Sequence, residues 1–414
     1  MKAVVLAAGR GRRFGKKLKP LAKVAGREII LRNFIMLSRL GVEEFIIVGS
    51  NNKIKEFLER YDFKFRFILN ESPEKGNGYS LYLARDYVDD DFVLIMGDHV
   101  YDKEFLKRAI KGRGLIGDRI GKFVSLEEAT KVKCRNGKVE RTGKNLDKWD
   151  YIDTGFFVLS PEIFRYAAGI VCKKEEVNLC EIIERAKPEI TEVSGYFWMD
   201  IDTPDDLQKA RKEIVRLSVK AEGDGFISRN LNRKISTRIS ERLSDHVTPS
   251  FMTLLSFLIG LLSCFLVFVN RPAAGIIYQL SSILDGVDGE IARASMRESR
   301  IGGWLDSILD RYIDFLFLLF LAIVSKAWFF AALAIFGSVM VSYSTERYRA
   351  SFGEDAYRIK AMRYLLGKRD ERIFIIMIFC IFNLIAELLI VIAVVANIRV
   401  LLTILVIYKE KSDS

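Results

Sequence analysis

The chain has 414 residues, 50% of them hydrophobic, and its formal net charge is +11. It is too long for one typical domain and too apolar for a wholly soluble protein. Much of the positive charge flanks long apolar segments, where Lys and Arg usually set membrane topology, so we expect no nucleic acid as a partner. The five cysteines lack the paired spacing of a zinc site or a disulfide framework, and they fit a reducing compartment.

Apolar residues are unevenly distributed along the chain. Residues 1–220 mix charged and apolar positions as a globular α/β domain does, whereas residues 247–414 contain several long uncharged runs. Residues 221–246 place apolar side chains at helical spacing among lysines and arginines, which predicts a linker with an interfacial amphipathic helix. We therefore expect a multidomain protein with an N-terminal α/β domain and a C-terminal all-α transmembrane domain.

Short β-rich runs alternate with helical stretches in the N-terminal part. The expected strands are 3–7, 44–48, 65–69, 92–96 and 151–159, and the expected helices include 29–40, 53–59 and 78–87. This alternation is typical of a Rossmann-like, mostly parallel sheet covered by helices, with its ligand at the carboxyl ends of the strands. The first apolar run is too short for a signal peptide, so we expect this half to stay in the cytoplasm.

A segment rich in glycine and arginine follows the first expected strand. Small residues let backbone N–H groups approach a triphosphate, and arginines neutralise its charge. The residues concerned are Leu6, Ala7, Ala8, Gly9, Gly11 and Arg13, with Lys19 shortly after them. The segment resembles the LAAGxGxR…PK signature of sugar-phosphate nucleotidyltransferases, although Leu18 stands where the signature has its proline. The resemblance implies that the small residues bind the nucleotide and that Arg13 and Lys19 are the catalytic cations.

Two later segments match the same family pattern and contain the expected metal ligands. Gly76 lies in a small-residue loop that resembles the one contacting the nucleobase, and Asp98, after strand 92–96, resembles the first metal ligand at the nucleotide. Asp200 resembles the second metal ligand, with Asp202 as the alternative. Mg²⁺ prefers oxygen ligands and keeps part of its shell for phosphate, so two carboxylates are enough; Mn²⁺ is an alternative ion.

The same resemblance implies the second substrate and the reaction. Lys144, Thr154 and Gly155 match the parts of the pattern that hold a sugar or alcohol phosphate. A phosphomonoester oxygen would attack the α-phosphorus of a nucleoside triphosphate and release pyrophosphate. The protein would contribute alignment and positive charge rather than covalent chemistry.

Six apolar segments in residues 247–414 are expected to cross a membrane. They are 251–269, 272–294, 303–325, 327–345, 373–386 and 388–408, the last of them interrupted by Arg399. Lys and Arg concentrate after the second and the fourth segment, as they do in cytoplasmic loops. We therefore expect a multi-pass protein of the cell membrane, with both termini and the α/β domain in the cytoplasm.

Four carboxylates lie in the second and third of these segments. Asp285 and Asp288 are three residues apart and Asp306 and Asp310 four apart, so each pair shares a helix face. Two antiparallel helices would bring all four to a similar depth, where divalent cations offset their mutual repulsion. Carboxylates are costly inside a membrane, so a functional role is the default expectation.

The stretch resembles, without gaps, the DxxDGxxAR…GxxxDxxxD signature of CDP-alcohol phosphotransferases, and the resemblance extends over residues 225–408. It implies that the four carboxylates bind metal at the donor's diphosphate and that Asp310 is the general base for the acceptor hydroxyl. Gly289 would permit close approach of the nucleotide, and Arg293 would pair with the donor's phosphates. Basic residues that follow the fourth segment are candidates for an anionic acceptor, although topology also explains them: Arg358, Lys360, Arg363, Arg369 and Arg372.

The order of the two halves resembles a family of bifunctional archaeal and bacterial enzymes that join an inositol-1-phosphate cytidylyltransferase to a synthase of a di-inositol phosphodiester. That resemblance implies CTP, inositol 1-phosphate and CDP-inositol as ligands, and a homodimer formed through the membrane helices. Abundant Lys, Arg and Glu with only two glutamines fit a heat-loving source that makes an osmolyte.

Two other functions are weighed against this one. The alternative is phospholipid synthesis, in which a soluble CDP-alcohol made by the first half is transferred to a lipid hydroxyl. The third reading is a transporter or membrane scaffold whose carboxylates carry ions. The eight-residue spacing between Arg293 and Gly302 argues against it, because ion transport does not require that spacing.

Overall fold

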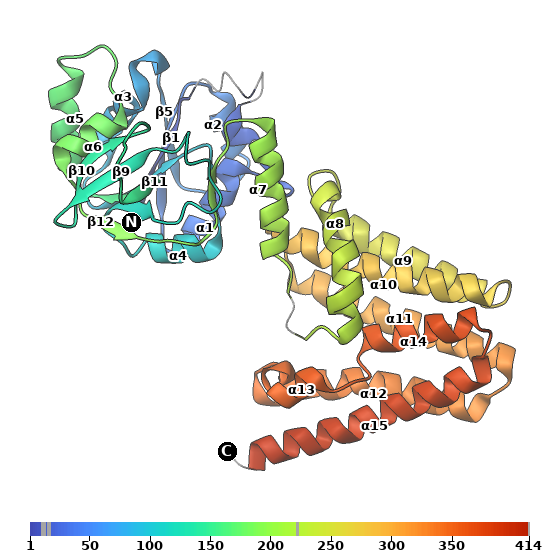
Figure 1. Cartoon of the computed structure of the whole chain (residues 1–414). Coiled ribbons are helices and arrows are strands. Elements are labelled where there is room, and N and C mark those ends of the chain that lie inside the picture. Colours follow the sequence, from blue (N-terminus) through green and yellow to red (C-terminus); the bar gives the residue numbers. More distant parts are fainter. Residues whose placement is uncertain (10–13, 15–17, 221–222, 413–414) are drawn as a thin grey trace. The chain divides into compact units, whose positions relative to one another are not determined.

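The computed structural model describes residues 1–9, 14, 18–220 and 223–412 (Figure 1). The chain divides into two compact units, Met1–Ile214 and Val215–Ser414. Gly11 and Arg13 of the predicted nucleotide-binding segment lie outside the described residues.

The first unit is built around a mixed sheet. Strands β1 (Lys2–Ala7), β4 (Glu44–Gly49), β5 (Phe65–Leu69) and β6 (Phe92–Met96) are parallel neighbours in the order β6-β1-β4-β5. Their near-continuous apolar sequences suit strands that are covered on both faces. The predicted α/β fold with a parallel core is therefore confirmed.

The sheet is antiparallel on the other side of β6. Strand β11 (Tyr151–Leu159) runs against β6 and also pairs with β8 (Gly114–Asp118) and β9 (Lys131–Arg135). Strand β10 (Lys138–Gly143) extends the sheet beyond β9, and β12 (Ile190–Glu192) extends it beyond β8. The sequence predicts strand 151–159 but not its direction, because an apolar pattern reads the same in both directions.

Helices cover the sheet on both faces. Helices α3 (Gly76–Leu83), α5 (Ile163–Val171) and α6 (Leu179–Ala186) share one apolar core with the strands. On the opposite face Phe34 of α1 stacks on Phe45 of β4, with ring centroids 3.9 Å apart. The bounds of α1 and of the other helices and short strands are Ile29–Ser38 (α1), Lys53–Leu58 (α2), Lys103–Ala109 (α4), Pro204–Leu217 (α7), Lys23–Val24 (β2), Arg27–Glu28 (β3), His99–Tyr101 (β7) and Trp198–Asp200 (β13).

Gly76 begins α3 and does not lie in a loop before it. Its φ is +89°, and a Cβ there would lie 2.4 Å from the carbonyl oxygen of Val177. Glycine permits both this conformation and this close approach. The helix predicted over 78–87 therefore starts earlier, and it ends at Leu83, before a 3₁₀ turn at Arg85–Tyr87.

The described part of the second unit is helical, and each of the six predicted segments overlaps mainly one helix, although the ends differ. These six long helices are α9 (Pro249–Leu266), α10 (Arg271–Ala294), α11 (Arg300–Ser325), α12 (Trp328–Phe352), α14 (Arg369–Ile381) and α15 (Ile385–Ser412), with the short α13 (Lys360–Tyr364) before α14. Three of them, α9, α12 and α15, are long and apolar enough to cross a membrane. The other three helices are α10 and α11, which carry the signature carboxylates, and α14, which has 13 residues.

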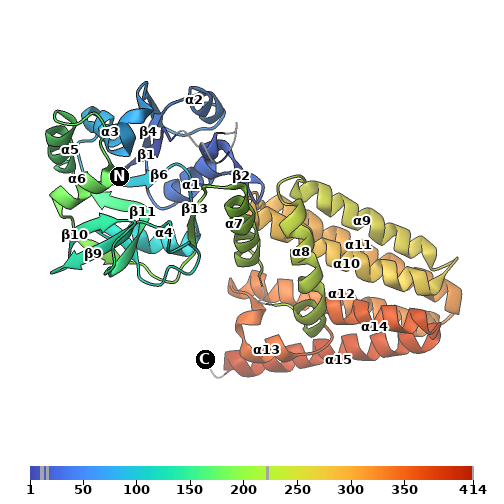
Figure 2. The same cartoon turned by 45° about the horizontal axis from the view of Figure 1, so that its top comes forward.

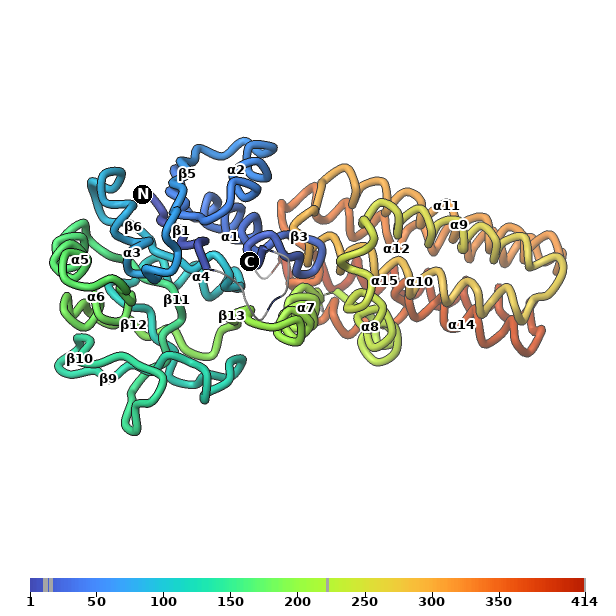
Figure 3. The backbone as a smooth tube through the Cα atoms, turned by 90° about the horizontal axis from the view of Figure 1, so that it is seen from above, coloured from blue at the N-terminus to red at the C-terminus, as the bar shows by residue number. Residues whose placement is uncertain are grey.

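These helices lie side by side along much of their length (Figures 2 and 3). Small residues allow close contacts between them, as is common in membrane bundles. A Cβ on Gly275 of α10 would lie 2.8 Å from the Cβ of Cys380 on α14, and one on Gly260 of α9 would lie 3.0 Å from Oγ of Ser281 on α10. Larger residues at these two positions would force the helices apart.

Buried polar groups explain why α14 begins before the predicted uncharged run 373–386. Asp370 accepts a 2.7 Å hydrogen bond from the backbone N–H of Ser228, and Arg372 donates a 2.7 Å bond to the carbonyl of Gly367. Arg399, which interrupts the last apolar segment, is buried in a similar way and donates to the carbonyls of Leu365 and Leu366. Buried charged residues are thus tolerated in these helices where they form hydrogen bonds with backbone groups.

The predicted amphipathic helix consists of a π-helical turn, Ser228–Asn232, followed by α8 (Arg233–Leu243). Its side facing α10 is mixed: the hydroxyls of Ser236 and Ser240 donate to the fully buried Glu290 over 2.7 and 2.6 Å, and Ile239 and Leu243 pack against an apolar cluster that includes α10 residues. Apolar side chains lie on its exposed side: Leu231 and Ile235 are each 38% exposed. An interfacial helix needs such an exposed apolar side.

Candidate active sites

The first candidate site lies where β6 ends. The chain turns through Gly97 and Asp98 into β7, which pairs antiparallel with β13 so that His99 stands opposite Asp200. A Cβ on Gly97 would lie 2.9 Å from the end of β1, so glycine is needed for the turn to pass that strand. The turn places Asp98 at the carboxyl end of the parallel strands, the usual place for a ligand in this kind of sheet.

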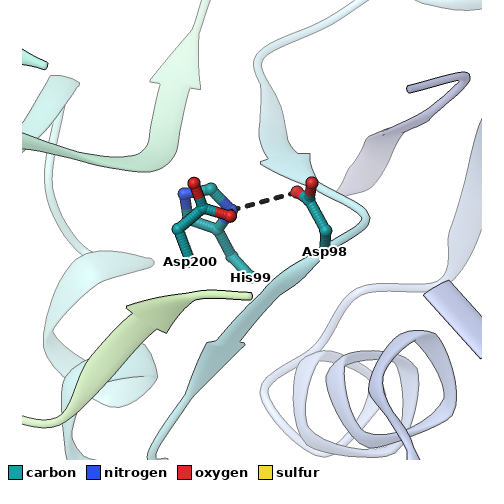
Figure 4. Close-up of side chains that lie close together, drawn as sticks. All are labelled: Asp98, His99 and Asp200. Carbon is teal, nitrogen blue, oxygen red and sulfur yellow. Dashed lines mark hydrogen bonds and ion pairs between the residues drawn. The ribbon is translucent and has the colours of Figure 1, made fainter. Parts of the chain in front are cut away.

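Asp98, His99 and Asp200 form a compact group (Figure 4). Nδ1 of His99 lies 3.2 Å from Oδ1 of Asp98 and 3.7 Å from Oδ1 of Asp200. One ligand atom from each residue lies within 4.8 Å of the others, which is close enough for a shared ion. The sequence predicts the two carboxylates. It does not assign His99, because the strand pairing that completes the group joins segments far apart in the chain.

The charges in this group stabilise one another. Burial alone would lower the pKa of His99, but Asp200 and Asp98 raise it to about 9, so the ring is protonated at neutral pH. Burial raises the pKa of Asp200 to about 6, whereas in Asp98 burial is outweighed by His99 and Lys19, which lower the pKa. Mg²⁺ prefers oxygen ligands, so the two carboxylates suit it better than the imidazole does.

Lys19 reaches the same group from the 3₁₀ turn Lys19–Leu21. Its Nζ lies 3.4 Å from Oδ2 of Asp98 and forms an ion pair with Asp202. Burial lowers the pKa of Lys19, but the neighbouring carboxylates outweigh this and raise it. Lys19 thus contacts both Asp98 and Asp202, whereas the compact group of possible ligands contains Asp200 and not Asp202.

A cavity of about 550 Å³ opens beside these residues. The predicted site residues that line it are Asp98, Asp200, Lys144 and Gly155. Asp153 also lines it; burial raises the pKa of Asp153 to about 6, and its Oδ1 accepts a 2.9 Å hydrogen bond from the N–H of Gly155. Thr154 is instead fully buried in the sheet, where its hydroxyl donates to the carbonyl of Ile116 over 2.7 Å.

The described residues of the predicted nucleotide-binding segment lie at the end of β1 and directly after it. The side chains of Leu6, Ala7 and Ala8 are buried, and Gly9 is exposed. None of these four residues is among those that line the cavity of the first site. Asn77, next to Gly76, lines the cavity at the start of α3.

The substitution Gly155→Ala is expected to destabilise the first unit strongly. Gly155 has φ +67°, and a Cβ there would lie 2.6 Å from Nε2 of His99. Backbone strain of about 1–2 kcal/mol would add to an overpacking cost of about 1–3 kcal/mol. Gly137→Ala is the matched control, since Gly137 has φ +75° with nothing within 4 Å of its Cβ position. Calorimetry should show a larger decrease in the unfolding temperature for Gly155→Ala than for Gly137→Ala. Equal decreases would mean that the His99 side chain moves aside at no cost in free energy.

The second candidate site lies between α10 and α11. Carboxylate oxygens of Asp285 and Asp288 on α10 and of Asp306 on α11 lie within 4.8 Å of one another. The hydroxyl of Thr253 on α9 donates a 2.5 Å hydrogen bond to Asp288. Oxygen ligands at this spacing suit a hard divalent cation. Thr253 lies outside the signature, so the sequence does not single it out.

Asp310 lies next to this group and is paired with an arginine. Nη1 of Arg369, the first residue of α14, lies 2.8 Å from Oδ2 of Asp310 and 3.5 Å from Oδ2 of Asp285. The three-carboxylate group does not include Asp310. Of the four predicted carboxylates, three are therefore arranged for a shared ion, and the fourth stands beside them with a cationic partner.

Two large cavities reach the carboxylates, in addition to a small one of about 10 Å³ lined by Asp285, Asp306 and Asp310. One, of about 570 Å³, is lined by Asp288, Asp306, Gly289 and Arg293. Nε of Arg293 donates a 2.6 Å hydrogen bond to the carbonyl of Ser218. The predicted residues Gly289 and Arg293 thus lie at the same cavity as two of the carboxylates.

The other cavity, of about 250 Å³, is lined by Asp285 and Asp310 and by the cations Arg233, Lys368 and Arg369. Among the basic residues proposed for an anionic acceptor, Arg369 lines this cavity, whereas Arg358, Lys360 and Arg363 are exposed. Arg363 donates a 2.7 Å hydrogen bond to the carbonyl of Tyr357. The sequence shows a cluster of cations here but not which of them turns inward.

Comparison with known proteins identifies both halves. Residues 3–120 match the model of the MobA-like NTP transferase domain, and residues 246–407 match that of CDP-alcohol phosphatidyltransferase. Curated relatives named "Bifunctional IPC transferase and DIPP synthase" are 51% identical in Aquifex aeolicus, over 99% of both chains, and 50% identical in Thermococcus kodakarensis, over 99% of this chain and 98% of the other. A relative of the same name in Archaeoglobus fulgidus is 48% identical over 99% of this chain and 85% of its own.

One solved structure that resembles the first unit is that of the inositol-1-phosphate CTP transferase from T. maritima. It is 25% identical, covers 51% of this chain and 96% of its own, and has a TM-score of 0.46.

Proposed function

The chain belongs to the family of bifunctional IPC transferase and DIPP synthase enzymes, and from this we propose the following pair of reactions. CTP and inositol 1-phosphate give CDP-inositol and pyrophosphate; CDP-inositol and a second inositol 1-phosphate then give a phosphorylated di-inositol phosphodiester and CMP. The observation that carries the proposal is identity of 48–51% over 99% of the chain to relatives with that name. The chain is thus both a nucleotidyltransferase and a CDP-alcohol phosphotransferase.

In the first reaction, Asp98 and Asp200 would hold Mg²⁺ or Mn²⁺, which when bound supplies positive charge at the phosphates. Two carboxylates close together at a cavity support this assignment. Lys19, oriented by Asp98 and Asp202, would stabilise charge on the triphosphate, and Arg13 would act with it. Inositol 1-phosphate would lie in the same cavity, near Lys144 and Gly155.

The substitution Lys144→Ala is expected to raise the KM for inositol 1-phosphate about tenfold or more without changing the KM for CTP. A charge-assisted hydrogen bond is worth about 1.5–3 kcal/mol, which corresponds to that range. Lys148→Ala is the control, because Lys148 is an exposed lysine of the same loop. Initial rates of pyrophosphate release at varied concentrations of each substrate measure both constants. An increase confined to the KM for CTP would place Lys144 at the nucleotide instead.

In the second reaction, Asp285, Asp288 and Asp306 would hold the divalent metal at the diphosphate of CDP-inositol. The donor would occupy the cavity of Gly289 and Arg293, and Asp310 would take the proton of the acceptor hydroxyl. The phosphate of the acceptor would lie near Lys368 and Arg369, because these cations line the other cavity together with Asp310. The exposed Arg358, Lys360 and Arg363 would then attract the anion from solution.

We also propose that all six long helices cross the cell membrane with both termini in the cytoplasm. The distribution of basic residues supports this orientation. Helices α10 and α11 would cross with their carboxylates directed to the interior of the bundle, where polar groups are tolerated. The further proposals, a homodimer through these helices and an osmolyte as product in a heat-loving organism, rest on the family resemblance and on composition.

Incubation of the purified protein with labelled inositol 1-phosphate, CTP and Mg²⁺ tests the function. A labelled soluble phosphodiester, with release of both pyrophosphate and CMP, is the expected result. A product that partitions with added lipid would support the alternative, head-group transfer in phospholipid synthesis. The transporter interpretation does not stand, since the chain belongs to a family of enzymes.

A further inference from the structure

A fifth carboxylate, that of Asp314, lies next to the second site. Asp314 lies on α11 one helical turn after Asp310, outside the signature, and it is only 8% exposed. Its Oδ1 accepts a 2.6 Å hydrogen bond from the hydroxyl of Tyr278 on α10. Nε of Arg369 donates to both of its oxygens, over 3.1 and 3.2 Å.

Arg369 connects this carboxylate to the reacting groups. While its Nε is held by Asp314, its Nη1 lies 2.8 Å from Asp310 and 3.5 Å from Asp285. A guanidinium is planar, so fixing the Nε edge also fixes the direction of the Nη1 edge. Asp314 thereby determines where the cation meets Asp310.

A metal-binding role does not suit Asp314. The three-carboxylate group within 4.8 Å consists of Asp285, Asp288 and Asp306 and does not contain it. Its oxygens are already engaged by Tyr278 and Arg369, and Arg311 lies at a longer distance of 3.9 Å. A buried carboxylate is costly unless it is paired and hydrogen-bonded, and Asp314 meets both conditions through these neighbours.

We propose that Asp314 is a positioning residue for the transfer reaction: it orients Arg369, which holds Asp310 beside the metal-binding carboxylates and faces the acceptor cavity. The inference rests on the proposed role of Asp310 as the base. Tyr278 assists by donating to Oδ1 of Asp314. A chain of contacts, Tyr278 to Asp314 to Arg369 to Asp310, therefore extends the site beyond the signature residues.

A double-mutant cycle in the full-length protein tests this proposal. The variants are Asp314→Asn, Arg369→Gln and the two together, each supplied with CDP-inositol and inositol 1-phosphate. We expect Asp314→Asn to lower kcat for CMP release by about 10- to 100-fold, with the KM for CDP-inositol changed less than about twofold. The double variant should be no slower than Arg369→Gln alone, because Asp314 acts through that arginine.

Losses that multiply in the double variant, or an unchanged kcat in Asp314→Asn, would overturn the proposal. Tyr278→Phe is a milder second variant, which removes one hydroxyl and keeps the ring that stacks on Phe317. It should lower kcat about threefold in the wild-type background and not at all beside Arg369→Gln; a loss of equal size in both backgrounds would contradict the proposal. If the unsubstituted protein makes no CMP from these substrates, the proposed function itself fails, which is a separate outcome.

Discussion

The substitution Asp98→Ala is expected to abolish synthesis of the CDP-alcohol while leaving transfer from supplied CDP-inositol intact. Asp98 lies at the turn after β6, its ligand atom is within 4.8 Å of those of His99 and Asp200, and Lys19 lies 3.4 Å away. Its removal would take away a proposed metal ligand and a partner of Lys19 together. We expect pyrophosphate release to fall by about 10²- to 10³-fold, the size of effect seen when one electrostatic group is lost from an active site.

Two assays on the same preparation measure this result: pyrophosphate release from CTP with inositol 1-phosphate, and CMP release from CDP-inositol. Asp89→Ala is the control, because Asp89 is an exposed carboxylate of the same unit, paired with Lys2. Loss of both activities in Asp98→Ala would refute separate sites. Unimpaired pyrophosphate release would remove Asp98 from the metal site.

The substitution Asp310→Asn is expected to stop transfer while pyrophosphate release continues. Asparagine keeps the shape of the side chain and an oxygen for Arg369, but it cannot take up the proton of the acceptor hydroxyl. General-base catalysis contributes about 10²- to 10⁴-fold, so kcat for CMP release should fall by that factor. CDP-inositol should then accumulate in the complete reaction mixture.

Glu346→Gln on α12 is the matched control, since Glu346 is an exposed carboxylate of the same unit. Chromatography of the nucleotide products distinguishes the outcomes, with CDP-inositol retained in Asp310→Asn and consumed in the control. Undiminished CMP release from Asp310→Asn would exclude Asp310 as the base and leave it a role in pairing with Arg369.

Helical spacing explains why the second site was largely predictable. Positions three and four residues apart share a face, and a short connection makes neighbouring helices antiparallel. These two rules bring together Asp285, Asp288 and Asp306, as the structure has them. Asp314 was not predicted, because its function depends on Arg369, which enters from α14 more than fifty residues later.

The first site depends more on contacts between distant segments. The end of a parallel strand indicates Asp98 as a ligand, but the pairing of β7 with β13 puts Asp200 opposite His99, and periodicity carries no information about that pairing. The choice between Asp200 and Asp202 stayed open in the sequence for the same reason. In the structure Asp200 lies in the compact group with Asp98 and His99, whereas Asp202 pairs with Lys19.

Helix ends were the least predictable part of the fold. A search for uncharged apolar runs places the fifth segment at 373–386. Helix α14 instead starts at Arg369, because Asp370 and Arg372 form hydrogen bonds with backbone groups. The difference matters for function, since the first turn of α14 contributes Arg369. A purely hydropathic criterion excludes from the helix the very residue that reaches the carboxylates.

The two cavities at the second site meet different members of the same carboxylate cluster, Asp288 and Asp306 on one side and Asp285 and Asp310 on the other. If donor and acceptor occupy these cavities as proposed, both would be held at the same time in a ternary complex. No side chain would then have to store the transferred group between two half-reactions, and bond formation and departure of CMP would belong to a single displacement at phosphorus.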